Sequence, residues 1–342
     1  MAPPPAFGSQ AYWDNRFTYN PSPFEWLEPP KILDAHLVAA LEACRDENPQ
    51  ILHIGCGTSL LSFHLRAHVN RPSQIHNLDY SEVAIEVGKK REQEVFRDEQ
   101  SRKRSHEAFE DQDQDSEPAE SPDIKKRQTN SRAASLSPSA SPSLSNQRSP
   151  KLPTSHMHWS FADLLSPSSL LSVCQPSTYS LIVDKSTSDS ISCADDIVVP
   201  LPYPFYTPTS NPPPSKTHLI SREPVHPLHV LAIHLALVIK PGGRWIALSY
   251  SEDRFPFLRP RHEDSGDCDD VEAIPNEHLE HGLPDPGGLW KLERKDVIEV
   301  QEKQKDGSTH RPKIQHFVYV LVRTEMPLGV REYWRDGLGA NS

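Results

Sequence analysis

The sequence predicts an α/β fold: a seven-stranded, mostly parallel sheet with helices on both faces and an antiparallel hairpin at its C-terminal end. Short apolar runs of strand length alternate along the chain with longer segments of helical periodicity. This pattern is typical of a parallel sheet that is covered on both faces. Near the end of the chain, the strand-like runs 295–302 and 315–324 flank Asp306-Gly307, which is a hairpin turn signal.

The first elements come before a change of composition near residue 97. Ile32–Ala43 places apolar residues near helical spacing, and Ile51–Ile54 is a short apolar run that ends in glycine, which indicates a buried strand. Ser81 is a suitable N-cap for a helix that continues to Phe96. Between them we predict a helix over 60–68 and a strand over 74–78.

The remaining elements follow the same alternation. Strands are predicted over 156–161 and 179–183, and a long apolar helix over 227–239. Pro241-Gly242-Gly243 ends that helix, because proline and glycine both interrupt helical structure. The strand 244–249 then precedes the C-terminal hairpin.

Composition predicts one domain with long insertions. The chain has 34 prolines against 14 glycines, and residues 97–150 contain only four Val, Ile, Leu or Phe residues. Such a segment cannot bury enough apolar surface to offset its ordering entropy. We therefore predict a first half-domain at 1–96, a disordered insertion at 97–155, a second half-domain at 156–325 with irregular insertions at 199–217 and 260–287, and a tail at 326–342.

Charge and cysteine content limit the partners and the compartment. The net charge of −11 argues against a general nucleic-acid binder. The five cysteines are scattered without a C-x-x-C pair, which indicates free thiols and no zinc or disulfide framework. The first residues carry no secretory signal, and no apolar run approaches the ~20 residues of a membrane span. We expect a soluble, cytoplasmic or nuclear monomer that binds no membrane.

The segment Gly55-Cys56-Gly57 joins a predicted strand to a predicted helix. A turn without side chains at its glycines lets a ligand approach the backbone closely. A dinucleotide-binding fingerprint requires a third glycine at position 60, where this chain has Leu60. This disfavours a nicotinamide dinucleotide, and a tight turn that binds no ligand stays an alternative.

Acidic residues follow three of the predicted strands. Asp79 ends the strand after the glycine turn, at the spacing where a carboxylate accepts hydrogen bonds from both ribose hydroxyls. Asp163 follows the next strand, where a carboxylate can receive an adenine amino group. Asp184 and Lys185 end the strand at 179–183 and face the edge of the sheet at which α/β proteins bind ligands. Together they favour a nucleoside cofactor, although each alone could be a capping residue or a surface charge.

Several short motifs resemble one known family. The chain is similar to the seven-strand, Rossmann-like S-adenosylmethionine-dependent methyltransferases related to the elongation factor 1A lysine methyltransferases and the citrate synthase lysine methyltransferase. The resemblance is spread over about 12–96, 156–198 and 226–324. The motifs that carry it are Tyr12-Trp13-Asp14-Asn15-Arg16-Phe17, Phe24-Glu25-Trp26-Leu27, Ile54–Ser59, Leu78-Asp79-Tyr80-Ser81, Asp184–Asp189, Pro241–Trp245, Arg254-Phe255 and Trp290.

The resemblance implies roles for individual residues. It implies that Trp13, Phe17 and Phe24 form a wall of the S-adenosylmethionine site, that Gly55 lies against the methionine part of the cofactor, and that Asp79 with Tyr80 holds its ribose. It also implies that Asp163 and Leu164 flank the adenine and that Lys185 lies beside the cofactor. Gly57 is also assigned to the cofactor site. The chain departs from the family in having Asp184 for a glutamate and Ser186 for a glycine.

The expected activity is methyl transfer to a lysine side chain of a protein, such as a translation factor. A lysine amine must lose its proton before it can attack, and we predict that Asp184 and Lys185 are catalytic, with Asp184 orienting the amine. Two alternatives stay open. The acceptor can be a small molecule or another nucleophile, or the chain can be a binding module without catalysis.

Three further signals are assigned no function. Asn211-Pro212-Pro213-Pro214 resembles a motif of amide-nitrogen methyltransferases but does not follow the fourth strand directly. His226, His229 and His234 lack the i, i+4 spacing of a metal-binding pair, and we assign no metal site. The basic runs 102–104 and 125–127 lie in the acidic insertion, where they are most simply solvated charge.

Overall fold

The computed structural model describes residues 5–110, 156–208, 219–259, 274–300 and 314–332, with side chains omitted for 98–110. The chain divides into two compact units, residues 1–92 with 154–342 and residues 93–153. The first unit contains the whole sheet. The predicted turn at Asp306-Gly307, the Asn211–Pro214 motif and the basic run 125–127 lie outside the described residues.

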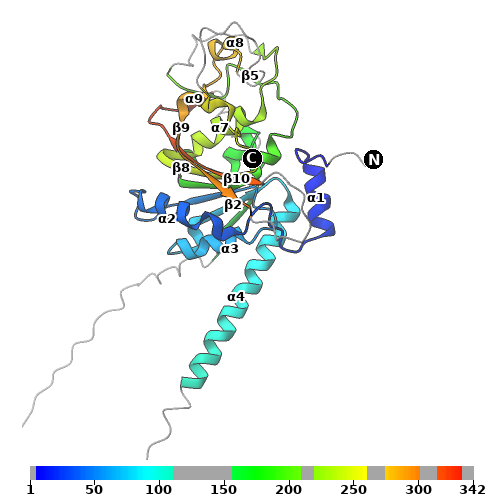
Figure 1. Cartoon of the computed structure of the whole chain (residues 1–342), viewed down its shortest axis with the longest axis vertical. Helices are drawn as coiled ribbons and strands as arrows, with labels where there is room; N and C mark the ends of the chain where they lie inside the picture. Colours follow the sequence, from blue (N-terminus) through cyan, green and yellow to red (C-terminus); the bar gives the residue numbers. More distant parts are fainter. Residues whose placement is uncertain (1–4, 111–155, 209–218, 260–273, 301–313, 333–342) are drawn as a thin grey trace, which may run out of the picture. The chain divides into compact units, whose positions relative to one another are not determined.

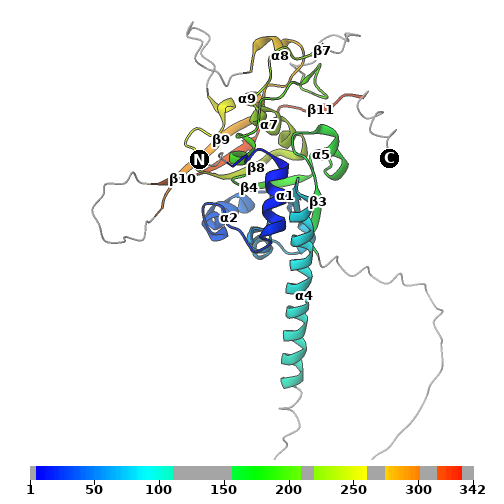
Figure 2. The ribbon, with the colours of Figure 1, turned by 90° about the vertical axis from the view of Figure 1, so that its right-hand side faces the viewer.

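The core of the first unit is a seven-stranded mixed sheet, as predicted (Figure 1). Five neighbouring strands pair in parallel, and β10 pairs antiparallel to the strands on both of its sides, β8 and β9. The strand β10 lies between β8 and β9, so the C-terminal hairpin inserts its second strand next to the parallel part (Figure 2). From edge to edge the order is β3 (His158–Phe161), β2 (Ile75–Asp79), β1 (Ile51–Ile54), β4 (Tyr179–Lys185), β8 (Ile239–Ser249), β10 (Gln315–Arg323) and β9 (Trp290–Glu299).

Alternate residues of the strands supply two separate hydrophobic clusters, one on each face. In β1, for example, Leu52 and Ile54 belong to one cluster, whereas Ile51 belongs to the other. Because successive side chains of a strand point to opposite faces, both faces must be covered. The helix α7 (Pro227–Val238) packs in the first cluster, and α2 (Asp34–Glu42) packs in the second. Helices on both faces are thus confirmed.

The helices differ from the prediction mainly where they are short. The segments η1, α2, α3, η2 and α7 fall within one or two residues of the predicted helices, whereas α1, α5 and α6 were not predicted. In the N-terminal helix α1 only Phe17 is buried, so its apolar periodicity is too weak to reveal a helix. The remaining bounds are α1 (Gln10–Tyr19), η1 (Pro30–Leu33), α3 (Leu61–Leu65), η2 (Arg66–His68), η3 (Pro72–Gln74), α4 (Glu82–Glu110), α5 (Pro167–Val173), α6 (Thr187–Ile191), η4 (Pro256–Leu258), α8 (Asn276–Glu280) and α9 (Pro286–Leu289).

The start of the predicted disordered insertion is helical. The helix α4 continues past Phe96 to Glu110, so residues 97–110 are not irregular. The reason lies in local propensity: the stretch contains Arg, Glu, Gln, Lys and Ala and has neither proline nor glycine. The low apolar content of this stretch argues against a packed core, but a helix can form without one.

The proline-rich stretch after residue 198 contributes side chains to the core, although its strands have only two residues each. Val199, Leu201, Tyr203 and Phe205 are buried in the larger hydrophobic cluster and alternate with prolines. This period of two places every apolar side chain on one side of an extended chain, even though proline prevents a central strand. The short strands formed here are β5 (Pro200–Leu201), β6 (Phe205–Tyr206), β7 (Leu219–Ile220) and β11 (Gly329–Val330).

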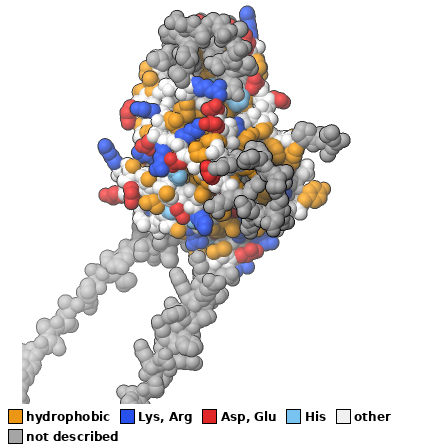
Figure 3. Space-filling model, viewed as in Figure 1, with side chains coloured by type: hydrophobic (Ala, Val, Ile, Leu, Met, Phe, Trp, Pro, Cys, Tyr) orange, Lys and Arg blue, Asp and Glu red, His pale blue; other side chains and the backbone are white. Residues whose placement is uncertain are grey.

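The stretch predicted to be irregular over 260–287 likewise contains structure. Its described part holds α8 and the start of α9, and Ile274 and Leu283 are buried in the larger cluster. The cysteines at 44, 56, 174 and 193 are free thiols, and Cys268 lies outside the described residues. On the face drawn in Figure 3, acidic and basic side chains of the described residues are interspersed. Among the described helices, none combines the length and the apolar character that a bilayer span requires.

Candidate active site

A cavity of about 260 Å³ opens at the carboxyl ends of the parallel strands β1, β2 and β4. Ligands of open α/β sheets bind at this edge because the loops that leave the strands converge there. The cavity brings together all ten residues that the sequence assigned to the cofactor, namely Trp13, Phe17, Phe24, Gly55, Gly57, Asp79, Tyr80, Asp163, Leu164 and Lys185.

The glycine turn leaves β1 in a conformation that only glycine adopts readily. Gly55 and Gly57 have φ values of 55° and 49°, in the left-handed region where a Cβ atom is unfavourable. A Cβ on Gly55 would lie 2.1 Å from Thr187 Oγ1, whose hydroxyl donates a 2.9 Å hydrogen bond to the carbonyl of Ile54. The turn is therefore packed tightly against the start of α6, with its backbone open to the cavity.

Backbone N–H groups from two turns at the edge of the sheet hold the Asp79 carboxylate in place. The carboxylate accepts hydrogen bonds from the N–H of Gly57 at 2.8 Å and from the N–H of Ser81 at 2.9 Å. Burial raises the pKa of Asp79 to about 6, against the effect of these hydrogen bonds, which stabilise the ionised form. The carboxylate thus joins the glycine turn to the end of β2.

Aromatic side chains from the N-terminal segment form one wall. The rings of Trp13 and Phe17 stack with centroids 5.6 Å apart, and the tip of Phe17 would be 3.1 Å from a Cβ on Gly57. Trp13 Nε1 donates to the carbonyl of Phe7 and to Ser190 Oγ, at 2.7 and 3.1 Å. These contacts join α1 to the Gly57 turn at one end and to Phe7 and Ser190 at the other, and so hold α1 against the cavity.

A buried ion pair ties the segment after α1 to the sheet. Lys185 Nζ donates a hydrogen bond to the Glu25 carboxylate, which also accepts from Ser59 Oγ at 2.9 Å and from the N–H of Leu60 at 2.6 Å. The Lys185 side chain is only 3% exposed, and burial lowers the pKa of its amine to about 8. Glu25 lies within one of the sequence motifs, but the sequence assigned it no role, because only the fold brings it to Lys185.

Asp184, which the sequence predicted to be catalytic, lies outside the cavity lining. It is fully buried and accepts hydrogen bonds from the N–H groups of Thr187 and Ser188 at 2.7 and 3.3 Å. Burial, together with the charge of Asp189, raises its pKa to about 7. The carboxylate therefore holds the first turn of α6, and its geometry does not present it to an acceptor amine.

The family glycine that is absent from this chain has a structural counterpart in Ser186. This residue has φ of 65°, in the left-handed region that glycine occupies without steric cost. Ser186 Oγ donates to the carbonyl of Leu248 at 3.3 Å. The serine thus keeps the backbone shape of the turn between β4 and α6.

The side of the cavity formed by Asp163 and Leu164 is supported by a buried histidine. His234 Nδ1 lies 2.7 Å from the carbonyl oxygen of Leu164, and its Nε2 lies 2.6 Å from Tyr203 Oη. Burial lowers the pKa of His234 to about 4, so the ring is neutral at physiological pH. The Asp163 carboxylate accepts from the N–H of Leu165 at 2.9 Å, which orients the loop after β3.

The opposite rim holds an ion pair that the sequence did not reveal. Asp189 lines the cavity and bonds to Arg254 Nε at 2.7 Å, and both side chains are less than 10% exposed. The Asp189 carboxylate also accepts from the N–H of Tyr250 at 3.2 Å, which places Tyr250 in the rim. Phe7, Trp26, Ser190 and Cys193 complete this side. These residues come from two parts of the chain, 7–26 and 189–193, which only the fold brings together.

The topology of the sheet decides the fold. Numbered in chain order, its strands are arranged 3-2-1-4-5-7-6, with the seventh antiparallel to its neighbours. This is the class I methyltransferase fold. In this sheet, Gly55, Gly57 and Asp79 follow or end the first two strands and line the cavity.

Comparisons with known proteins relate part of the chain to a curated sequence. No protein-family model matches the chain. Methyltransferase srdJ of Neurospora crassa is 40% identical over 98 residues, which is 28% of this chain. The match spans 40% of the length of that relative.

Solved structures with a similar arrangement include three methyltransferases. The N-methyltransferase NodS of Bradyrhizobium japonicum, in complex with S-adenosyl-L-homocysteine, has a TM-score of 0.42 at 10% identity, covering 92% of this chain and 98% of that one. An S-adenosylmethionine-dependent methyltransferase of Anabaena variabilis has a TM-score of 0.42 at 12% identity, covering 93% and 94%. The magnesium protoporphyrin IX methyltransferase of Synechocystis has a TM-score of 0.37 at 10% identity, covering 92% and 93%.

Proposed function

We propose that this protein is an S-adenosylmethionine-dependent methyltransferase whose acceptor is a small molecule. The observation that carries the proposal is the cavity itself: the Asp79 carboxylate, held by the Gly57 and Ser81 N–H groups, faces the same space as the side-chain-free glycine turn. The residues fit a nucleoside with an amino-acid tail, because the ribose-binding carboxylate Asp79 and the glycines Gly55 and Gly57, which have no side chains, line the same cavity.

Different residues of the cavity would contact the ribose, the adenine and the methionine part of the cofactor. Asp79 accepts hydrogen bonds from the ribose hydroxyls, and Asp163 with Leu164 lies at the place of the adenine. The turn Gly55–Gly57 lies against the methionine part, and the Phe17 ring covers the cavity next to this turn.

Little chemistry is required of the protein. The cofactor supplies an electrophilic methyl group when bound, so the chain must align the acceptor with that group and exclude water. The aromatic wall of Trp13 and Phe17 excludes water, and the ion pair of Lys185 with Glu25 fixes the segment that carries this wall.

The rim of the cavity favours a small, largely apolar acceptor. Beyond the cofactor residues, the lining includes the apolar or aromatic side chains of Phe7, Trp26, Ile191, Ala194 and Tyr250, beside the polar Asp189 and Ser190. Apolar and aromatic lining with a few oriented polar groups is typical of small-molecule sites. The Asp184 carboxylate, which would have oriented a lysine amine, is buried away from this rim.

A protein lysine is the second candidate acceptor. It is supported by the order of the motifs in the sequence, from Tyr12–Phe17 to Asp184–Asp189. In that case Asp189, which lines the cavity whereas Asp184 does not, is the candidate carboxylate for orienting an incoming amine.

The proposal is tested in two steps. Calorimetric titration with S-adenosylhomocysteine should give one binding event in the wild type and none in Asp79→Ala. The protein is then incubated with a cell extract and methyl-labelled S-adenosylmethionine, and the extract is separated into small molecules and proteins. Label in the small-molecule fraction supports the proposal, and label confined to proteins selects the lysine alternative. A wild type that binds no cofactor would overturn both.

A further inference from the structure

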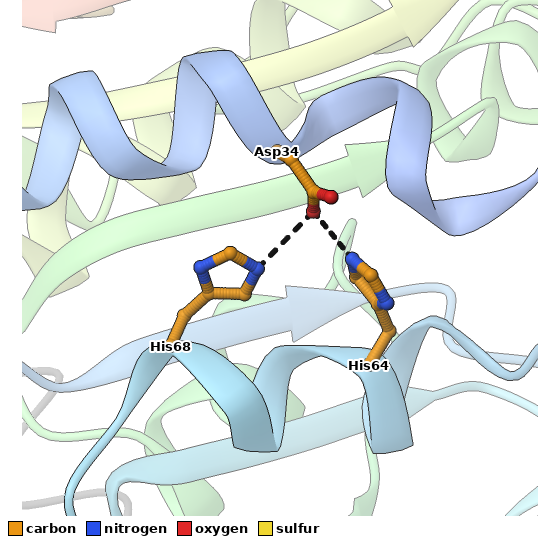
Figure 4. A group of neighbouring side chains, drawn as sticks. All are labelled: Asp34, His64 and His68. Carbon is orange, nitrogen blue, oxygen red and sulfur yellow. Dashed lines mark hydrogen bonds and ion pairs between the residues drawn. The ribbon is translucent and has the colours of Figure 1, made fainter.

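Three side chains that take no part in the cavity converge on one point between α2 and the helical segment α3–η2 (Figure 4). Asp34 Oδ1 lies 2.5 Å from His64 Nε2 and 3.2 Å from His68 Nε2. The two imidazoles therefore direct their Nε2 atoms at the same carboxylate oxygen. All three ligand atoms lie within 4.8 Å of one another.

The local structure explains this convergence. His64 and His68 are four residues apart on consecutive turns, so they lie on the same face of the helical segment. Their ring centroids are 5.5 Å apart. Asp34 is the first residue of α2, which faces them in Figure 4.

We propose that Asp34, His64 and His68 bind one zinc ion. Two imidazole nitrogens and one carboxylate oxygen are a donor set that zinc accepts, with a fourth position left for water.

The distances are close to those of a bound site. Tetrahedral zinc with ligands at about 2.0–2.1 Å separates its donor atoms by about 3.3 Å. The contact of Asp34 with His68, at 3.2 Å, already matches this separation, and the contact with His64, at 2.5 Å, must open by about 0.8 Å. The side chains of Asp34 and His64 are 44% and 28% exposed, so they have room to move and an ion can reach them.

A bound ion would act as a clamp between helices. α3 begins directly after the glycine turn, and the N–H of Leu60 at its start bonds to Glu25. Zinc between Asp34 and the two histidines would therefore hold α2 to the helix that follows the cofactor turn. The expected role is structural, because none of the three residues lines the cavity.

The test uses the full-length protein without an affinity tag, since a histidine tag would itself bind zinc. Metal is removed with a chelator, and ZnCl₂ alone is titrated by calorimetry and by competition with a chromophoric chelator. We expect one equivalent to bind and the unfolding temperature to rise by at least ~3 °C at saturating zinc. Cobalt(II) should give the visible absorption bands of a four-coordinate site.

Variants identify the ligands. Asp34→Asn, His64→Gln and His68→Gln should each weaken zinc binding by at least ~100-fold, because even outer-shell partners of metal sites cost about 10–100-fold. His281→Gln is the matched control, since that imidazole lies against the Glu277 carbonyl of its own short helix, and it should bind like the wild type. Circular dichroism of each variant verifies that it is folded.

Two outcomes would overturn the proposal and leave a hydrogen-bonded triad only. One is the absence of stoichiometric zinc binding in the wild type, and the other is equal binding by the His64→Gln/His68→Gln double variant. Cofactor binding is measured separately, so a failure of the zinc site is distinguishable from a failure of the proposed activity.

Discussion

At the scale of single residues, the polar groups of the cavity are oriented by the backbone before any ligand arrives. Asp79 accepts hydrogen bonds from the N–H groups of Gly57 and Ser81, and Asp163 accepts one from the N–H of Leu165 in its own loop. Such preorganisation lowers the entropic cost of binding because the side chains are already ordered. Single substitutions here should affect cofactor affinity and stability together.

Gly55→Ala tests the packing of the turn. An alanine at φ of 55° is strained, and its Cβ would meet Thr187 Oγ1 at 2.1 Å. We expect a loss of about 2–4 kcal/mol in the free energy of unfolding, measured by urea denaturation, together with weaker cofactor binding. Gly288→Ala is the control, because nothing lies within 4 Å of its added Cβ. Equal stability of the two variants would contradict the close approach of Gly55 to α6.

The pH dependence of cofactor affinity tests Asp79. Because burial raises the Asp79 pKa to about 6, the carboxyl is ionised above that pH and protonated below it. Only the ionised form accepts hydrogen bonds from both ribose hydroxyls, so affinity should be full near pH 7.5. It should fall by about 10-fold for each pH unit below 6. Calorimetric titrations with S-adenosylhomocysteine between pH 5 and 8 measure this, and Asp79→Asn should bind weakly with a flat profile. A flat wild-type profile would exclude the role of Asp79.

At the scale of elements, short helices with few apolar residues were the hardest to predict. The strand β1 was predicted to the residue, because a buried parallel strand is a continuous apolar run. In contrast, α6 has five residues and depends on Asp184, which bonds to two N–H groups of its first turn. No periodic signal exists at that length, and tertiary contacts decide the conformation.

Substitutions of Asp184 separate helix capping from catalysis. Asp184→Asn keeps an acceptor oxygen for the Thr187 N–H, so turnover should stay within ~3-fold of the wild type. Asp184→Ala leaves buried N–H groups without a partner and should lower the free energy of unfolding by about 2–3 kcal/mol. Steady-state kinetics and thermal denaturation of both variants measure the difference. If Asp184→Asn abolished turnover without loss of stability, the catalytic role predicted from the sequence would be restored.

At the scale of the whole molecule, the chain combines one packed unit with a second unit that begins inside α4, at Gln93, and ends at Pro153, before β3. Within the packed unit, the chain segments that lead into and out of the second unit are bonded to each other. Glu92 accepts hydrogen bonds from the N–H of Met157 at 2.8 Å and from Trp159 Nε1 at 2.9 Å. These contacts hold the two ends of the insertion close together. The fold of the packed unit should therefore tolerate loss of the insertion.

Replacement of Gln93–Pro153 by a short glycine–serine linker tests this independence. We expect the unfolding temperature to change by less than ~3 °C and cofactor affinity to stay within ~3-fold, because the first unit contains the whole sheet and both hydrophobic clusters. Differential scanning calorimetry and calorimetric titration provide the measurements. Glu92→Ala in the shortened chain should be destabilising, since it removes the acceptor at the junction. An unfolded product carrying intact Glu92 would show that the second unit is required for folding.

The sequence alone determined the alternation of strands and helices, the glycine turn and the acidic strand ends, because each is a local pattern of apolar period or spacing. It did not determine which side chains meet. Glu25 reaches Lys185, Asp189 reaches Arg254, and Asp34 reaches the His64–His68 pair only through contacts between elements that are distant in the chain. The same limit explains Asp184: its place at a strand end was readable, but whether its carboxylate turned to the cavity or to α6 was decided by the buried N–H groups that required an acceptor.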